Sequence, residues 1–295
     1  MTTGTGASPT AAPPKRVAIA VPLSSRPGLT PDEEISLRHL HRYLAPFDKF
    51  VILPEGSDAK LAGCTPLHFP RRYFGSPSAH ARLMLSPRFY ECFTAYDYVL
   101  TYHLDALVFS DRLLEWCELD LDFIGGPWRD HDSGDLVVGN GGFALRRVAG
   151  FLRLLSSRDY AADPAARWQE FCASRSAYAR VRNLPRKYLL HLKLFNSVQR
   201  ELRNNARMNL SDDTFLADAV PVLAPWFRIA PLETALRFSF DNAPRQCFEA
   251  NGSQLPFGCH AWFKWDRAFW EPYLLPEHAS AAAAPARNAV VCDAG

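Results

Sequence analysis

Four short segments of the chain contain the residue types from which catalytic and metal sites are built. In the first, Tyr102-His103-Leu104-Asp105, a carboxylate directly follows an apolar run. Desolvating a charged side chain there costs several kcal/mol unless a cation or hydrogen-bond donors compensate it. Because hard cations prefer oxygen ligands, Asp105 is a candidate metal ligand; the alternative is a carboxylate that caps the following turn.

The second segment, residues 138–146 (VGNGGFALR), places three glycines around Asn140. Glycines allow a positive φ and a close approach of the backbone to a ligand. The segment therefore predicts a ligand-lining loop at Asn140, Gly141 and Gly142, followed by a short strand. A plain tight hairpin turn is the alternative. Upstream, residues 125–128 (GGPW) add a second flexible joint with an aromatic wall at Trp128.

The third segment, Ser211-Asp212-Asp213, has the signature of a helix start. Ser211 is predicted to cap a helix whose first turn holds both carboxylates, where the helix dipole favours negative charge. The helix start is a sufficient structural reason for one of the two carboxylates. The other is a candidate general base, with a pKa set by its burial.

The fourth segment, residues 256–265 (PFGCHAWFKW), is unusually dense in Gly, His and Trp. His260 could bind a metal ion together with Asp105, since imidazole is a common metal ligand. A histidine buried in an aromatic core is the alternative.

Several enzyme classes lack their motifs in this chain. No G-x-G-x-x-G follows the first predicted strand, and no P-loop, G-x-S-x-G or H-E-x-x-H pattern occurs. Dinucleotide oxidoreductases, P-loop NTPases, serine hydrolases and zincins are therefore not favoured. If a nucleotide binds, a divalent cation is the usual replacement for a glycine cradle around its diphosphate.

The pattern of apolar runs predicts the elements that must position these segments. Strands are expected at residues 17–21, 50–53 and 98–102, with helices at about 31–44, 78–85 and 88–93. The first of these helices begins with a capping box, Thr30-Pro31-Asp32-Glu33. Such alternation predicts an open, mostly parallel sheet with helices on both faces. These sheets bind ligands at the carboxyl ends of their strands, where Asp105 is placed.

Composition and charge set the wider context. The 295 residues are 48% hydrophobic and 22% charged, which predicts one globular α/β domain at 16–278 with loose tails at 1–15 and 279–295. No long apolar window or secretory signal is evident, so a cytoplasmic protein is expected.

The net charge of +2 is unevenly distributed. Residues 175–207, from Arg175 to Arg207, contain nine basic side chains against Glu201. This segment is expected either to be a solvated helix face or to contact an anionic surface, such as the inner face of a membrane. Without an RNA-binding motif or recognition helix, nucleic acid is not an expected partner.

The order of the segments resembles nucleotide-sugar glycosyltransferases of the GT-A fold. More closely, the chain is similar to a family of bacterial glycosyltransferase-like proteins known by a domain-of-unknown-function label. The matching stretches are 32–37 (DEEISL), 82–86 (RLMLS), 98–109 (YVLTYHLDALVF), 123–128 (FIGGPW), 138–146 (VGNGGFALR), 212–215 (DDTF) and 256–266 (PFGCHAWFKWD). The resemblance implies a single-domain GT-A-like (Rossmann-like) α/β fold with an open mixed, mostly parallel sheet flanked by helices. It places a nucleotide-sugar half at about 16–125 and an acceptor half at about 126–278.

The resemblance also implies roles for individual residues. Asp105 matches the last acid of the metal-binding Asp-x-Asp motif, with His103 in place of the first acid. His260 is similar to a late histidine that completes the metal–diphosphate site, so Asp105 and His260 are the expected ligands of Mn²⁺ or Mg²⁺. Trp128 and Trp262 are the expected walls on the acceptor side. The implied donor-binding residues are Pro22, Ser24, Arg26, Arg82, His103, Asp105, Asn140, Gly141 and Gly142.

The expected activity is transfer of a sugar from a nucleotide-sugar donor to a glycan or lipid-linked acceptor in polysaccharide biosynthesis. Asp213 resembles the catalytic base of inverting members, with Asp212 in place of a neighbouring Glu. Relatives carry Pro-aliphatic-Tyr-Lys after the first strand, whereas this chain has Pro22-Leu23-Ser24-Ser25-Arg26 and lacks that stacking partner for a nucleobase. A retaining transferase without a protein base and a catalytically idle module that binds a glycan or partner are the alternatives.

Overall fold

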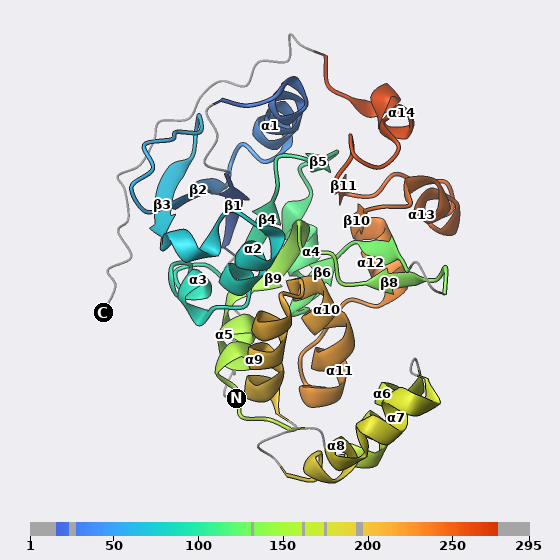
Figure 1. Ribbon diagram of the computed structural model, residues 1–295. Coiled ribbons are helices and arrows are strands. Elements are labelled where there is room, and N and C mark those ends of the chain that lie inside the picture. The colour runs from blue at the N-terminus through green and yellow to red at the C-terminus, as the bar shows by residue number, and fades with distance from the viewer. Residues whose placement is uncertain are drawn as a thin grey trace, which may run out of the picture.

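A six-stranded sheet in the order β3-β2-β1-β4-β9-β6 forms the centre of the molecule (Figure 1). The computed structural model describes residues 16–23, 28–130, 133–160, 163–173, 176–192 and 197–276. The predicted tails, and the predicted donor-binding residues Ser24 and Arg26, lie outside these ranges. The strands of the sheet are β1 (Val17–Pro22), β2 (Asp48–Pro54), β3 (Thr65–Phe69), β4 (Tyr98–Tyr102), β6 (Phe123–Gly125) and β9 (Phe143–Arg147).

The sheet is mixed but mostly parallel, as the sequence predicts. Strands β1 to β4 run parallel, β9 is antiparallel to β4, and β6 is antiparallel to β9. The register pairs Tyr102 with Phe143, so the loop before β9 lies at the carboxyl end of β4. The carboxyl edge of the parallel strands and the Asn-Gly-Gly loop are therefore neighbours.

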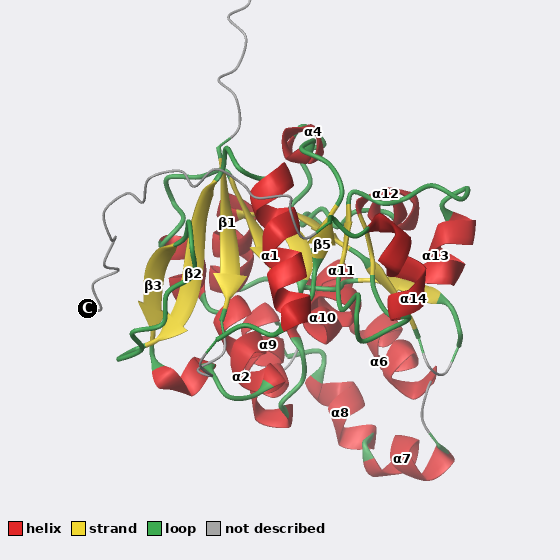
Figure 2. Ribbon diagram, turned by 90° about the horizontal axis from the view of Figure 1, so that it is seen from above, coloured by secondary structure: helices red, strands yellow, loops and turns green. Residues whose placement is uncertain are grey.

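The central strands are buried because helices cover both faces of the sheet (Figure 2). Alternate residues of β1 enter opposite cores: Ala18 and Ala20 face one core, and Val17 and Ile19 face the other. Helices α2, α3, α5 and α9 contribute to the first core, and α1, α4 and α12 to the second. The mixed α/β class expected from the sequence is confirmed.

The helices begin where the sequence provides caps and prolines. Helix α1 has the predicted capping box, in which Glu33 N donates to Thr30 Oγ1 over 3.3 Å and Thr30 N donates to Glu33 Oε2 over 2.8 Å. The helices are α1 (Pro31–Tyr43), α2 (Pro77–Met84), α3 (Pro87–Glu91), α4 (Leu113–Cys117), α5 (Val148–Ser156), α6 (Pro164–Ala173), α7 (Ala177–Arg182), α8 (Leu184–Leu189), α9 (Val198–Met208), α10 (Asp212–Thr214), α11 (Val220–Leu223), α12 (Leu232–Phe238), α13 (Pro244–Ala250) and α14 (Arg267–Trp270). Short single-turn helices lie at Arg71–Tyr73, Phe215–Ala219 and Glu271–Tyr273. Among the described residues, no helix has the length and apolarity needed to cross a membrane.

A second, small sheet joins distant parts of the chain. It consists of β5 (Leu107–Val108), β10 (Ser239–Phe240) and β11 (Gly258–Cys259). Strand β11 pairs with β5 on one side and with β10 on the other. The segments that precede β5 and follow β11 therefore lie side by side. A separate hairpin, β7 (Pro127–Arg129) and β8 (Leu136–Val138), extends beside them.

Candidate functional site

Three possible metal ligands, His103, Asp105 and His260, converge at the carboxyl end of β4. One nitrogen of each histidine and one carboxylate oxygen of Asp105 all lie within 4.8 Å of one another. Backbone hydrogen bonds hold the three segments together: His103 N donates to Gly142 O over 3.0 Å, and Trp262 N donates to Asp105 O over 3.0 Å. The long-range meeting of residues 105 and 260, expected from the sequence, is present in the fold.

The carboxylate of Asp105 has the environment of an incomplete cation site. Its Oδ1 lies 3.3 Å from His260 Nε2, yet this buried oxygen has no hydrogen bond of good geometry. Burial opposes ionisation, but the positive charge of His260 outweighs it and lowers the pKa of Asp105. A cation could take the place of the His260 proton beside this buried oxygen, because histidine binds metals in its neutral form.

His260 is oriented from behind by a second carboxylate. Its Nδ1 lies 3.1 Å from Asp241 Oδ1 and 3.1 Å from Asn140 Nδ2. Burial lowers its pKa, but Asp105 and Asp241 together raise it to about 10. If Nε2 held a cation, Nδ1 would carry the ring proton and donate a hydrogen bond to Asp241, which would fix the ligating tautomer.

His103 has a histidine partner, His80 of α2. Their Nε2 atoms are 3.1 Å apart, so one ring donates a hydrogen to the lone pair of the other. Burial is the main cause that lowers the pKa of both rings, and each positive neighbour lowers it further. Both imidazoles are therefore neutral at ordinary pH, which is the form in which histidine binds metals.

Two glycines connect this cluster with the paired acids of α10. A Cβ on Gly142 would lie 2.1 Å from His260 Nε2, and a Cβ on Gly141 would lie 2.7 Å from Asp212 Oδ2 and 2.9 Å from Asp213 Oδ1. The space beside Gly142 is therefore occupied by the His260 ring, and the space beside Gly141 is occupied by the two acids. Glycine is required here because any side chain would occupy the space of these groups.

The two acids have different surroundings. Asp212 is buried and forms an ion pair of 2.8 Å with Arg146, whose side chain is fully buried. Arg146 also donates to Tyr90 Oη over 3.2 Å and to Gly141 O over 3.3 Å. Asp212, which the sequence suggested as a catalytic partner, is thus occupied as the counterion of a buried guanidinium.

Asp213 is half-buried and has no such counterion. Burial, and next the charge of Asp212, raise its pKa from 3.8 to about 8. Ser211 Oγ accepts from Thr214 N over 3.3 Å, so the predicted helix cap is confirmed. A half-buried carboxyl with its pKa near neutrality, beside the buried glycine loop, can exchange a proton at ordinary pH, as a general base must.

The remaining predicted site residues are placed as follows. Trp128 is half-buried against Gly139, close to the Asp213 backbone. Arg82, on α2, donates to Asn209 Oδ1 over 3.3 Å, and Pro22 ends β1. Trp262 is fully buried and donates to Ser36 Oγ over 3.0 Å, so its predicted role as an acceptor wall is wrong. Its ring fills the core under β5 because a large apolar surface is more stable there.

Three polar residues of the site were not predicted: His80, Arg146 and Asp241. Asp241 follows β10 directly and so repeats the strand-end pattern that singled out Asp105. His80 and Arg146 carry no comparable signal, because a single histidine on a helix and a single arginine in a strand are common at surfaces.

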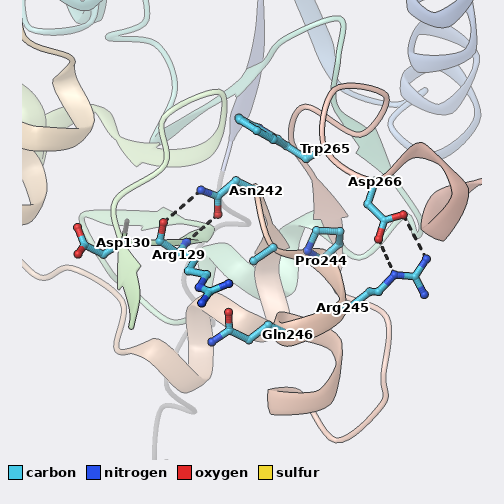
Figure 3. A pocket seen from close by; sticks show the side chains of 9 residues that line it. Arg129, Asp130, Asn242, Pro244, Arg245, Gln246, Trp265 and Asp266 are labelled. Carbon is cyan, nitrogen blue, oxygen red and sulfur yellow. Dashed lines mark hydrogen bonds and ion pairs between the residues drawn. The ribbon is translucent and has the colours of Figure 1, made fainter. Parts of the chain in front are cut away.

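A pocket of about 630 Å³ lies beside the site, between the β7–β8 hairpin and α13 (Figure 3). Asn242 connects the two sides of the pocket: Arg129 N donates to Asn242 Oδ1 over 2.7 Å, and Asn242 Nδ2 donates to Arg129 O over 3.2 Å. Trp265 lines one end. Because neighbouring residues of a strand point to opposite faces, Arg129 faces this pocket while Trp128 faces Gly139. The residues that line this pocket do not include the His103, Asp105 and His260 cluster or Asp213.

The fold and the cluster define a mixed α/β protein with a possible His-Asp-His metal site at the carboxyl edge of its central sheet. Residues 64–260, well over half of the chain, match the model of the family described as protein of unknown function (DUF5672), and the chain belongs to that family. The expected membership of a domain-of-unknown-function family is confirmed. A comparison with curated proteins gives no match.

Two solved structures are similar to this chain. One is a glycosyltransferase involved in the glycosylation of the major capsid of PBCV-1, with 10% identity, 86% of this chain and 96% of that chain covered, and a TM-score of 0.43. The other is the apo-form glycosyltransferase GlyE in Streptococcus pneumoniae TIGR4, with 14% identity, 88% of this chain and 60% of that chain covered, and a TM-score of 0.39. At such identities, function has to be argued from the side chains of the site.

Proposed function

We propose that the protein is a metal-assisted glycosyltransferase that uses a nucleotide-sugar donor and Asp213 as its catalytic base. The observation that carries the proposal is the shared glycine loop: a side chain at Gly142 would overlap His260 of the cation cluster, and one at Gly141 would overlap the Asp213 carboxyl. The dipeptide Gly141-Gly142 thus lies between the site for a diphosphate leaving group and the base for the acceptor. The sequence resemblance to GT-A enzymes supports the same assignment.

The residues present fit a divalent cation held by His103, Asp105 and His260. A bound cation supplies positive charge to the diphosphate oxygens as the sugar–phosphate bond breaks. Two imidazole nitrogens and one carboxylate favour Mn²⁺ over Mg²⁺, because Mg²⁺ prefers an all-oxygen ligand set. Asp241 and His80 hold the two rings in their ligating orientation.

Asp213 would accept the proton of an acceptor hydroxyl. That oxygen forms the new bond to the anomeric carbon while the bond from this carbon to the diphosphate oxygen breaks, and the nucleoside diphosphate leaves with the bonding electrons. The Asp212–Arg146 pair fixes the start of α10 and so positions Asp213. Trp128, against Gly139, bounds the space on the acceptor side. This arrangement corresponds to inversion at the anomeric carbon.

Calorimetry with Mn²⁺ and with UDP, GDP and CMP tests the proposal. We expect Mn²⁺ to bind, one nucleotide to bind more tightly in its presence, and Asp105→Asn to weaken Mn²⁺ binding about a hundredfold, since even outer-shell changes cost ten- to a hundredfold. Asp111→Asn, a change of an exposed acid outside the cluster, is the matched control. If no nucleotide binds at millimolar concentration, the result supports the alternative function, a catalytically idle module that binds a glycan or a partner.

Substitutions in the glycine loop separate the cation cluster from the base. Gly142→Ala places a methyl group where the His260 ring lies, so we expect Mn²⁺ affinity to fall at least about tenfold. Gly141→Ala instead meets Arg146, Asp212 and Asp213, and is expected to reduce transfer while Mn²⁺ binding is kept. Equal Mn²⁺ affinities in the two variants, with matching circular dichroism spectra, would contradict this division of the loop.

A further inference from the structure

Helices α7 and α8 form a projecting lobe with an unusually exposed apolar face. In both ribbon views they lie apart from the central sheet, with α6 beside them (Figures 1 and 2). The side chain of Tyr178 is 76% exposed, that of Tyr188 70% and that of Val181 65%. Leu184 and Leu192 are also exposed. Large apolar side chains gathered in this way on a protein surface mark a site of interaction.

The exposed apolar residues recur at helical spacing within each helix, and we call them the apolar stripe. Tyr178 and Val181 share one side of α7, Leu184 and Tyr188 share one side of α8, and Leu192 follows α8. The turn at Asn183 separates α7 from α8 without a long loop. The apolar stripe therefore consists of exposed side chains on two successive short helices.

Positive charge flanks the stripe. Residues 176–192 contain Arg180, Arg182, Arg186 and Lys187 and no acidic residue. Arg182 and Lys187 are exposed. An exposed apolar stripe flanked by Arg and Lys, with tyrosines at its edge, has the composition of a helix that lies in the headgroup region of a bilayer. The long basic side chains extend to lipid phosphates while their methylene groups stay with the apolar surface.

We propose that the α7–α8 lobe docks on the surface of an anionic lipid bilayer, with the apolar stripe inserted between the headgroups. The occupant is a lipid surface and not a protein, because residues 176–192 carry charge of one sign only, which complements anionic headgroups, beside exposed apolar side chains on a projecting element. The charge of the basic segment 175–207 alone is compatible with either a solvated helix face or an anionic contact; the exposed stripe adds the apolar contact that lets binding persist in salt. The proposal is independent of metal, nucleotide and transferase activity.

Vesicle sedimentation of the full chain tests the lobe, with phosphatidylcholine alone or mixed with phosphatidylglycerol. We expect the protein to sediment with the mixed vesicles, and the triple variant Tyr178→Ala, Val181→Ala, Tyr188→Ala to bind about tenfold more weakly. Arg182→Gln with Lys187→Gln is expected to lose a similar factor at low salt and less at high salt. Leu119→Ala, which removes an exposed apolar side chain outside the lobe, is the matched control and should bind as the parent does.

Two outcomes overturn the proposal. One is a parent chain that stays in the supernatant with both kinds of vesicle. The other is an oligomeric parent that becomes monomeric in the triple variant, as seen by light scattering, while neither binds lipid; the stripe is then a protein–protein contact. Because no nucleotide or metal is present, neither outcome bears on the proposed transferase activity.

Discussion

Asp213→Asn is expected to lower the rate of sugar transfer about a thousandfold while leaving donor binding unchanged, because an amide cannot accept the acceptor proton. The measurement is kcat with a donor found by the nucleotide screen, together with the donor dissociation constant. Asp218→Asn, which changes an exposed acid five residues further along the same segment, is the matched control. Near-normal turnover in Asp213→Asn would instead support a retaining mechanism, which the anomer of the product identifies.

The same substitution is expected to stabilise the fold at alkaline pH. The pKa of Asp213 is about 8 in the folded protein against an ordinary value of 3.8, so the folded state holds this proton more tightly. The contribution of the protonated Asp213 carboxyl to the stability of the fold is therefore complete below about pH 4, and it is lost as the pH rises towards 8. Asparagine resembles the protonated acid at every pH. Thermal unfolding at pH 9 should show the variant about 1–3 kcal/mol more stable than the parent, and the parent rate should rise with pH through about 8.

Asp212→Asn is expected to have the opposite effect and to destabilise the protein by about 3–5 kcal/mol. The substitution keeps the shape of the side chain but leaves the fully buried Arg146 without its counterion. Urea unfolding of the parent and the variant gives the difference in the free energy of unfolding.

A double variant shows whether charge is the cause. In Asp212→Asn with Arg146→Met, no unpaired charge remains, so a large part of the stability should return. If the free energy of unfolding of Asp212→Asn is within about 1 kcal/mol of the parent value, the Asp212–Arg146 pair does not stabilise the fold. Asp212 is then available as a second catalytic acid.

Much of the fold could be predicted from local patterns. The capping box at Thr30, the buried run 98–102 and the Ser211 cap each specify their element through a few neighbouring residues. The position of Asp105 at a strand end could likewise be read from the sequence, because the apolar run before it ends there.

What could not be predicted depends on contacts between distant segments. Arg146 resembles a surface residue until β9 is placed antiparallel to β4, which turns its side chain into the core beside Tyr90. His80 acquires its role only from the 3.1 Å contact with His103. Trp262 was predicted to line a pocket because exposed and buried aromatics look alike in a sequence; its burial follows from the pairing of β11 with β5.

The pairing of β5 with β11 also determines when the ligand set can exist. Asp105 leaves the ribosome early, whereas His260 is made more than half a chain length later and reaches its place only after β11 has joined β5. If the proposed cation site is correct, a nascent chain cannot complete it during most of its synthesis, even when the parallel strands have already formed. Proteolytic loss of the last forty residues would remove His260 and spare the parallel strands β1 to β4, so under the proposed function metal binding would report the integrity of the carboxyl-terminal region.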